Sequence, residues 1–224
     1  GVTTASDPEG RPTALDYLRG VRERVFPVGR LDWDAEGAVL FTNDGELANR
    51  LAHPRYGHQR VYLVKVKGDP EPEALRRMAE GVRLEDGPAK ALAVAIHERA
   101  EKNVWIRVVV GEGRFHLVKR LCEAVGLQVQ RLFRPEFGGV TVEGLRPGTF
   151  RALSAPEVRA MKPALTSGQP AGSAPLIRRL NSAASSECAR AYSSKRLFHS
   201  FSSPAPFTRA SQPAYTSAGI SKGG

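Results

Sequence analysis

Hydrophobic and polar residues alternate along residues 60–67, so that Tyr62, Val64 and Val66 fall on one side of an extended chain and a leucine and two lysines on the other. A period of two is typical of a strand with one buried face. Shorter signals of the same kind predict further strands over residues 39–41, 91–97, 104–110, 129–133 and 149–153.

Apolar residues that recur every three or four positions predict helices between these strands. The first helix begins at Asn43, where Glu46 three residues later completes a capping box, and it ends before Pro54. Further helices are predicted over residues 71–80, over 115–125 and after a second capping box formed by Ser154 and Glu157.

The hydrophobic pattern stops after Lys162, where serine, alanine, proline and glycine with scattered arginines replace it. Such a composition buries too little apolar area to offset the conformational entropy of the chain. We therefore expect one folded domain over residues 1–162 and a disordered basic tail over residues 163–224. The tail either holds RNA loosely or has no part in the domain's function.

The formal charge of +10 suits a polyanionic partner such as a nucleic acid, because lysine and arginine release counterions when they neutralise phosphates. The charge is unevenly distributed. Residues 163–224 contain seven basic residues and one acidic residue, a net charge of +6, which leaves +4 for residues 1–162. The whole-chain charge therefore overstates the basic character of the folded part.

Several classes of protein are disfavoured by what the sequence contains. Cys122 and Cys188 lie far apart without a CxxC spacing, which argues against structural zinc and a disulfide framework. The histidines show no ligand spacing, and the glycines form neither a dinucleotide motif nor a phosphate-binding loop. No apolar run approaches the roughly 18 residues that span a membrane. We expect a cytoplasmic monomer without metal or cofactor.

Three segments carry the candidate chemistry. VGRLDWDAEG, from residue 28, places Asp32 between an arginine and a short strand, RVYLVKVKG contains Tyr62, and GEGRFHLVKRLCEAVG, from residue 111, contains Lys119. By spacing alone, Asp32 could be a turn residue, Tyr62 a core residue and Lys119 a solvated lysine at the rim of a helix. A sheltered carboxylate beside a cation and an aromatic ring is the functional alternative.

With these three segments, residues 1–161 resemble the RsuA-like branch of ribosomal RNA pseudouridine synthases. The resemblance implies an α+β catalytic domain, with a mixed and mainly antiparallel sheet, flanking helices and a central cleft. It implies isomerisation of a uridine to pseudouridine in ribosomal RNA, which requires no metal or redox cofactor. The segment TNDGELANRL is more similar to relatives that act on large-subunit RNA.

The same resemblance implies roles for individual residues. Asp32 is the expected catalytic carboxylate, as a nucleophile or as the stabiliser of a sugar cation. Lys119 is its expected ion-pair partner, and Tyr62 is expected to stack on a uracil that has left its helix or loop. Residues expected to contact RNA phosphates or to support the loop are Arg30, Arg114 and Arg120.

The sequence also departs from the family pattern. Ala35 stands where the family usually has threonine, and Leu117 stands where it usually has glutamine. The segment GVTTASDPEGRPT resembles the second half of an opening motif, so we expect the catalytic domain to be incomplete at its start, without the S4-type RNA-binding domain of many relatives. The alternative function is an RNA-binding or ribosome-assembly factor that has lost turnover.

Overall fold

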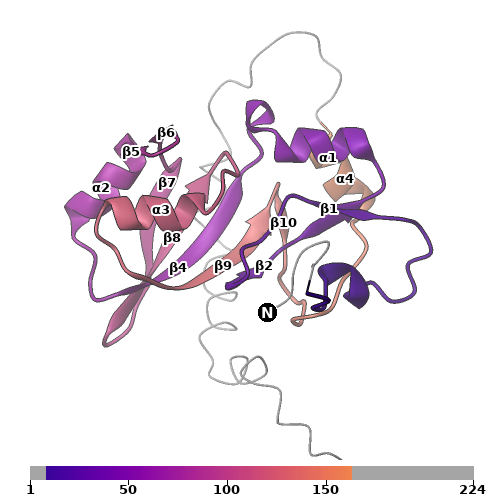
Figure 1. Cartoon of the computed structure of the whole chain (residues 1–224), viewed down its shortest axis with the longest axis horizontal. Coiled ribbons are helices and arrows are strands. Elements are labelled where there is room, and N and C mark those ends of the chain that lie inside the picture. Colours follow the sequence, from indigo (N-terminus) through magenta and orange to yellow (C-terminus); the bar gives the residue numbers. More distant parts are fainter. Residues whose placement is uncertain (1–8, 163–224) are drawn as a thin grey trace, which may run out of the picture. The chain divides into compact units, whose positions relative to one another are not determined.

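The computed structural model describes residues 9–162, and Figure 1 shows the order of their elements. The strands are β1 (Phe26–Val28), β2 (Ala35–Gly37), β3 (Leu40–Thr42), β4 (Arg60–Lys67), β5 (Val82–Leu84), β6 (Gly87–Ala89), β7 (Ala93–Arg99), β8 (Asn103–Val110), β9 (Val129–Phe137) and β10 (Val140–Thr141). The α-helices are α1 (Gly45–Ala52), α2 (Pro72–Glu80), α3 (Leu117–Ala124) and α4 (Ala155–Met161), with short 3-10 helices at Ala14–Tyr17 and Pro54–Tyr56.

A six-stranded sheet organises the domain. Its strands run in the order β10-β9-β4-β8-β7, every neighbour is antiparallel, and β2 adds to β9 as a parallel strand. Two small antiparallel pairs, β1 with β3 and β5 with β6, lie outside this sheet. The expected α+β fold with a mixed, mainly antiparallel sheet is confirmed.

The central strand β4 is formed as predicted, over the full range of residues 60–67. The expectation of a single buried face was incomplete, however, because Val61 and Leu63 are buried together with Val64 and Val66. β4 lies inside the sheet, hydrogen-bonded to β8 on one side and to β9 on the other, and side chains on both of its faces are buried.

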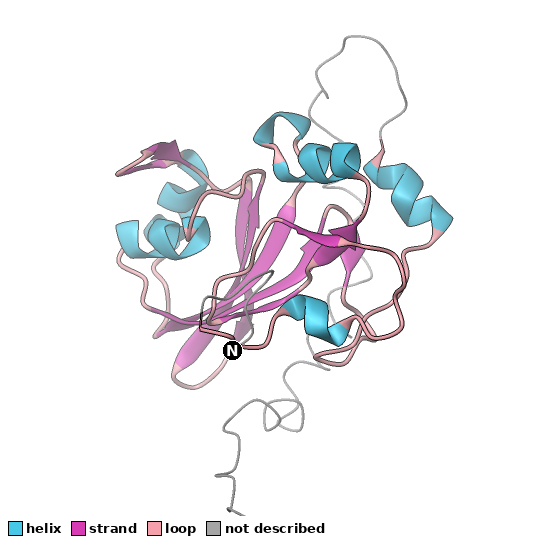
Figure 2. Cartoon of the chain, turned by 45° about the vertical axis from the view of Figure 1, so that its right-hand side comes forward, coloured by secondary structure: helices cyan, strands magenta, loops and turns pink. Residues whose placement is uncertain are grey.

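Two apolar clusters hold the helices. Residues of α2 and α3, such as Met78 and Leu121, pack with Val64 and Ile106 on one face of the sheet. The second cluster joins α1 and α4 to β1, β3 and the end of β9, and includes Phe137. In Figure 1 and Figure 2, α2 and α3 accordingly lie on one side of the long strands of the sheet and α1 and α4 on the other.

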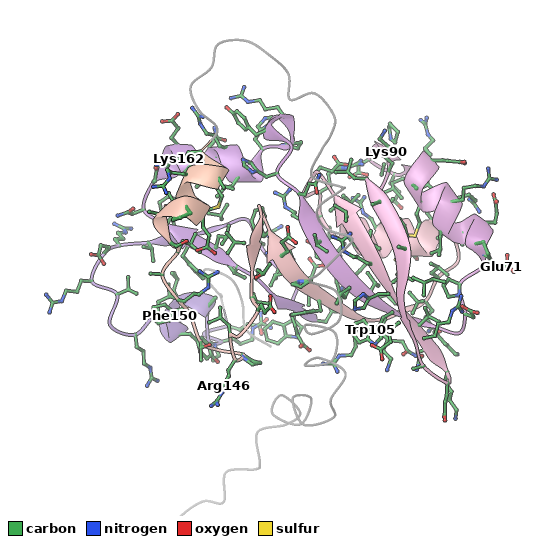
Figure 3. The ribbon with its side chains drawn as sticks, turned by 180° about the vertical axis from the view of Figure 1, so that it is seen from behind. Glu71, Lys90, Trp105, Arg146, Phe150 and Lys162 are labelled. Carbon is green, nitrogen blue, oxygen red and sulfur yellow. The ribbon has the colours of Figure 1, made fainter. Side chains whose placement is uncertain are left out.

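Both predicted capping sites begin helices, one of them a residue later than expected. Asp44, rather than Asn43, is the N-cap of α1, because its carboxylate accepts from the Leu47 amide at 3.0 Å. The capping box of Ser154 with Glu157 begins α4 as predicted. Lys162 at the end of α4 donates to Asp44 at 2.8 Å, and Figure 3 shows Lys162 where α4 meets α1.

The strand predictions are incomplete. Residues 149–153 form no strand, the short strands β1, β2, β5, β6 and β10 were not predicted, and β9 continues past Pro135 to Phe137. Proline can lie within β9 because the register of β9 on β4 shifts there, from Leu63 opposite Phe133 to Val61 opposite Glu136. Such a β-bulge does not require the backbone N–H that proline lacks.

The predicted disordered tail, residues 163–224, lies outside the described residues. Within the described part of the chain, no helix is both long enough and apolar enough to cross a membrane.

Replacement of Ile106 tests the position of the core. Ile106 is fully buried between the sheet and its helices, so Ile106→Ala should lower the free energy of unfolding by about 2–5 kcal/mol through lost burial and a residual cavity. Leu92→Ala, at an exposed leucine of the same domain, should change it by no more than about 0.5 kcal/mol. Urea titration measures both, and equal losses would contradict this placement of the core.

Candidate active site

The loop that carries Asp32 is held at both of its ends. β1 precedes it and pairs with β3, whereas β2 follows it and pairs with β9, where Ala35 lies opposite Leu132. The Ala35 amide donates to the Asp32 carbonyl at 3.0 Å and closes a turn. The Asp32 carboxylate, by contrast, accepts no hydrogen bond from a backbone amide of residues 9–162, so turn formation does not account for its side chain.

A cavity of about 190 Å³ lies beside this loop. Asp32 and Tyr62 both line it, together with Arg30 from the loop and with His116 and Leu117 from the start of α3. The central strand therefore supplies the aromatic ring, and the loop and α3 supply the charged groups. The structure thus brings two of the three predicted catalytic residues into one cavity.

Lys119, the third, lies at the border of this cavity. Its Nζ is 3.8 Å from Asp32 Oδ2, and it forms a closer ion pair with Asp34. Lys119 and Asp34 also line a neighbouring open cavity of about 320 Å³. One lysine therefore lies between two carboxylates, a competition that the sequence did not predict.

The two carboxylates differ in exposure. The Asp32 side chain is 23% exposed and that of Asp34 is 69% exposed. The hydrogen bond from Lys119 holds the pKa of the Asp34 carboxyl below its ordinary value of 3.8, against a smaller opposing effect of burial. Asp34 is therefore the solvated member of the pair, and Asp32 is the sheltered one that faces the cavity.

His116 is a site residue that the sequence analysis missed. Its Nε2 is 3.4 Å from Asp32 Oδ1, and its ring stacks on Phe115 with centroids 3.7 Å apart. It is the N-cap of α3 and the only residue other than glycine with positive φ, 49°, among residues 9–162. Such a conformation is strained for histidine. Because tertiary structure imposes this backbone angle, no local sequence pattern indicated the role.

Two buried arginines, Arg60 and Arg134, were also missed. Both line the cavity, and both are almost completely buried. The available signal was charge in an apolar context, since Arg134 interrupts the run around Phe133. An arginine in a strand is usually assigned to the solvent side, and only the sheet register shows that this one points inward.

Arg30 is the predicted phosphate-binding residue whose surroundings fit best. Its side chain is exposed, lines the cavity and forms no ion pair with any residue between 9 and 162. Its guanidinium is therefore available to an anion that enters the cavity.

Arg114 and Arg120 are engaged within the domain. Arg114 lines the cavity and donates to Asp86 Oδ1 at 3.1 Å and to Glu112 Oε1 at 2.8 Å. Arg120 pairs with Asp86 Oδ2 at 2.9 Å and does not line the cavity. Both arginines thus hold the β5–β6 hairpin against α3, which fits the supporting role better than phosphate contact.

The two departures from the family pattern both lie at the site. Ala35 and Leu117 line the same cavity as Asp32, and both pack against the main apolar cluster. Part of the wall beside the carboxylate is therefore apolar. No group of three or more histidine, cysteine or acidic side chains suited to a metal ion occurs among residues 9–162, and the absence of a metal or cofactor stays a prediction.

Comparison with known proteins gives the family of this chain. A family model described as RNA pseudouridylate synthase matches residues 1–124, so the chain belongs to that family. A solved structure described as a pseudouridylate synthase is 30% identical, with a TM-score of 0.61, and the match covers 72% of this chain and 69% of that one.

Curated relatives make the comparison more specific. The ribosomal large subunit pseudouridine synthase B of Bacillus subtilis is 38% identical over 72% of this chain, and the protein of that name from Pseudomonas aeruginosa is 46% identical over 70%. An RNA pseudouridine synthase of Aquifex aeolicus is 45% identical over 67% of the chain. The matched part spans 67%, 42% and 61% of these relatives, respectively.

Removal of the Lys119 charge tests the ion pair. In Lys119→Met the pKa of Asp34 should rise toward its ordinary value of 3.8, because the hydrogen bond from Lys119 is the main cause of its lowering. NMR titration of the side-chain carboxyl carbons measures it. Lys119→Arg is the matched control and should keep the pKa low.

The sign of the effect on stability follows from that direction. Because folding lowers the pKa of Asp34, the pair stabilises the protein above pH 3.8 and the contribution is lost as the pH falls through the lowered value. Asp34 is mostly exposed, so the contribution is at most about 1 kcal/mol. An Asp34 titration that is identical in the wild type and Lys119→Met would contradict the pair.

Proposed function

We propose that this protein isomerises a specific uridine to pseudouridine in ribosomal RNA, more specifically in large-subunit RNA. The observation that carries the proposal is the sheltered carboxylate of Asp32, which lies beside Lys119 and His116 and shares a cavity with the ring of Tyr62. Membership of the RNA pseudouridylate synthase family supports the reaction, and the names of the relatives support the large subunit.

The proposed chemistry uses only side chains of this chain. The target uridine leaves its helix or loop and its base enters the cavity, where Tyr62 stacks on it. The bond from N1 of the base to C1′ of the sugar breaks, and Asp32 either adds to the sugar or stabilises its positive charge. After the base turns, a bond from C5 to C1′ forms, C5 loses its proton and N1 gains one.

The cationic groups have separate proposed roles. Lys119, whose Nζ lies 3.8 Å from Asp32 Oδ2, orients that carboxylate and balances its charge in a partly water-excluded site. Arg30, exposed at the mouth of the cavity, contacts a phosphate of the RNA. Arg114 and Arg120 support the wall of the cavity. We further propose that the protein acts as a cytoplasmic monomer without metal or cofactor.

One observation favours a second candidate. Ala35 and Leu117 leave the cavity wall next to Asp32 without the hydrogen-bonding side chains usual in the family. An RNA-binding or ribosome-assembly factor with the same fold would bind ribosomal RNA and form no product.

Conversion of unmodified RNA separates these two functions. Wild-type protein incubated with transcribed large-subunit ribosomal RNA should form pseudouridine at a defined position, mapped by chemical modification and primer extension. Asp32→Asn should lower the rate by at least about 1000-fold, the order of loss expected for a reacting side chain. RNA binding should persist, because asparagine preserves the shape of the side chain.

Asp69→Asn is the matched control, since Asp69 is an exposed aspartate paired with Arg99 on the surface. It should leave the rate unchanged. Conversion that continues in Asp32→Asn would exclude the proposed role of Asp32. RNA binding by the wild type without any product would instead support the assembly factor.

A further inference from the structure

Arg134 is a buried cation without an acidic partner. It is 2% exposed, and none of the carboxylates in residues 9–162 forms an ion pair with it. Its Nε and Nη2 donate to the Ala38 carbonyl at 2.9 and 2.7 Å. A buried charge is costly unless its hydrogen-bonding capacity is satisfied, so this arrangement requires an explanation.

The contacts of Arg134 join three parts of the cavity. Nη1 lies 3.4 Å from the Arg30 carbonyl and 3.3 Å from the Tyr62 hydroxyl. Arg30 and Ala38 flank the loop that carries Asp32, and Tyr62 belongs to the central strand. One planar guanidinium therefore contacts both ends of the loop and the residue proposed to hold the base.

A β-bulge directs this side chain inward. Between Val61 and Leu63 the strand β4 has one residue, Tyr62, whereas between the partners of those two residues β9 has two, Arg134 and Pro135. A bulge bends its strand and changes the direction of a side chain, and bulges are frequent next to active sites. The extra residue in β9 thus brings Arg134 to the ring of Tyr62.

The chemistry of arginine then sets the direction of the Tyr62 hydroxyl. Guanidinium only donates hydrogen bonds, so the Tyr62 oxygen must accept from Arg134. The hydroxyl proton is left to point toward another acceptor, and Tyr62 lines the cavity. At 3.3 Å the bond is long, so its effect is on orientation more than on binding energy.

We propose that Arg134 is a positioning residue that keeps Asp32 and Tyr62 directed at the same nucleotide. Its guanidinium holds the loop by donating to the carbonyls of Arg30 and Ala38, and it holds the Tyr62 hydroxyl by donating to the phenolic oxygen. The proposal rests on the proposed function, because it assigns Arg134 a part in that reaction. Arg134 itself need not touch the RNA.

Arg60 provides the matched comparison within the same cavity. It is 5% exposed, and its guanidinium, like that of Arg134, lies over the Phe137 ring, at 4.7 and 5.1 Å. Its donors, however, reach the carbonyls of Leu51, Ala52 and His58 instead of the loop and Tyr62. Burial and charge are therefore shared by the two arginines, and the contact with Tyr62 is not.

A double-mutant cycle tests the proposal. Arg134→Lys keeps the positive charge and loses the planar set of guanidinium donors, and Tyr62→Phe keeps the ring and loses the hydroxyl. Arg134→Lys should lower kcat on large-subunit RNA by about 10–100-fold, as small errors in positioning do, and should change KM by less than about threefold. In the Tyr62→Phe background the same substitution should cost much less, because the two residues act through one contact.

Arg60→Lys is carried through the same cycle. It should lower the temperature of unfolding about as much as Arg134→Lys, and its effect on kcat should be the same in the presence and absence of the Tyr62 hydroxyl. The proposal is overturned if the effects of Arg134→Lys and Tyr62→Phe multiply independently. It is also overturned if Arg134→Lys raises KM with kcat unchanged.

A measurement without substrate separates this proposal from the proposed function. Amide hydrogen exchange over residues 30–38 should be faster in Arg134→Lys than in the wild type or Arg60→Lys, even if the protein converts no RNA. If Arg134→Lys folds and its amide exchange over residues 30–38 is unchanged, Arg134 does not hold the loop and the proposal is refuted. Arg134→Gln is the second variant, and failure of both to fold would also count against the proposal, since Arg134 would then be part of the fold itself.

Discussion

The parallel pairing of β2 with β9 is the constraint on which the rest of the site depends. The two backbones approach so closely that a Cβ on Gly37 would lie 2.2 Å from the Arg134 carbonyl oxygen. The next residue, Ala38, donates its amide to that carbonyl at 2.7 Å and accepts from the Arg134 guanidinium. A glycine is therefore required at this position, and the pairing of β2 with β9 fixes where the loop with Asp32 ends.

Charge is organised around this loop more strongly than the net charge of the domain indicates. Asp32 faces His116 and Lys119, two groups from the start of α3, and the buried guanidiniums of Arg60 and Arg134 lie in the same cavity wall. Asp86 holds Arg114 and Arg120 and so keeps the β5–β6 hairpin on α3. The result is a cavity lined by four arginines and two carboxylates, Asp32 and Glu112, of which Glu112 is paired with Arg114. This excess of positive charge suits a polyanionic ligand.

Much of this fold could be predicted from local signals. β4 was predicted over its whole length because alternation is strong there, and α2 and α4 followed from their proline, glycine and capping residues. The failures have physical causes. The predicted strand ended at residue 133 because the β-bulge that accommodates Pro135 depends on pairing with β4. The strands β1, β2, β5, β6 and β10 have only two or three residues each, too few for a periodic signal. Residues 149–153 have the composition of a strand and no neighbouring strand to pair with among residues 9–162.

The site divides in the same way. The sequence by itself determined the family and the central strand β4, because local motifs and periodicity carry that information, and the resemblance to the family marked Asp32, Tyr62 and Lys119 as candidates. Only the tertiary structure decided that Lys119 pairs with Asp34 as well as approaching Asp32, that His116 takes a strained backbone conformation beside the carboxylate, and that Arg134 points inward to Tyr62. These contacts join residues between 72 and 87 positions apart, or depend on a backbone angle that surrounding elements impose, so no stretch of local sequence encodes them.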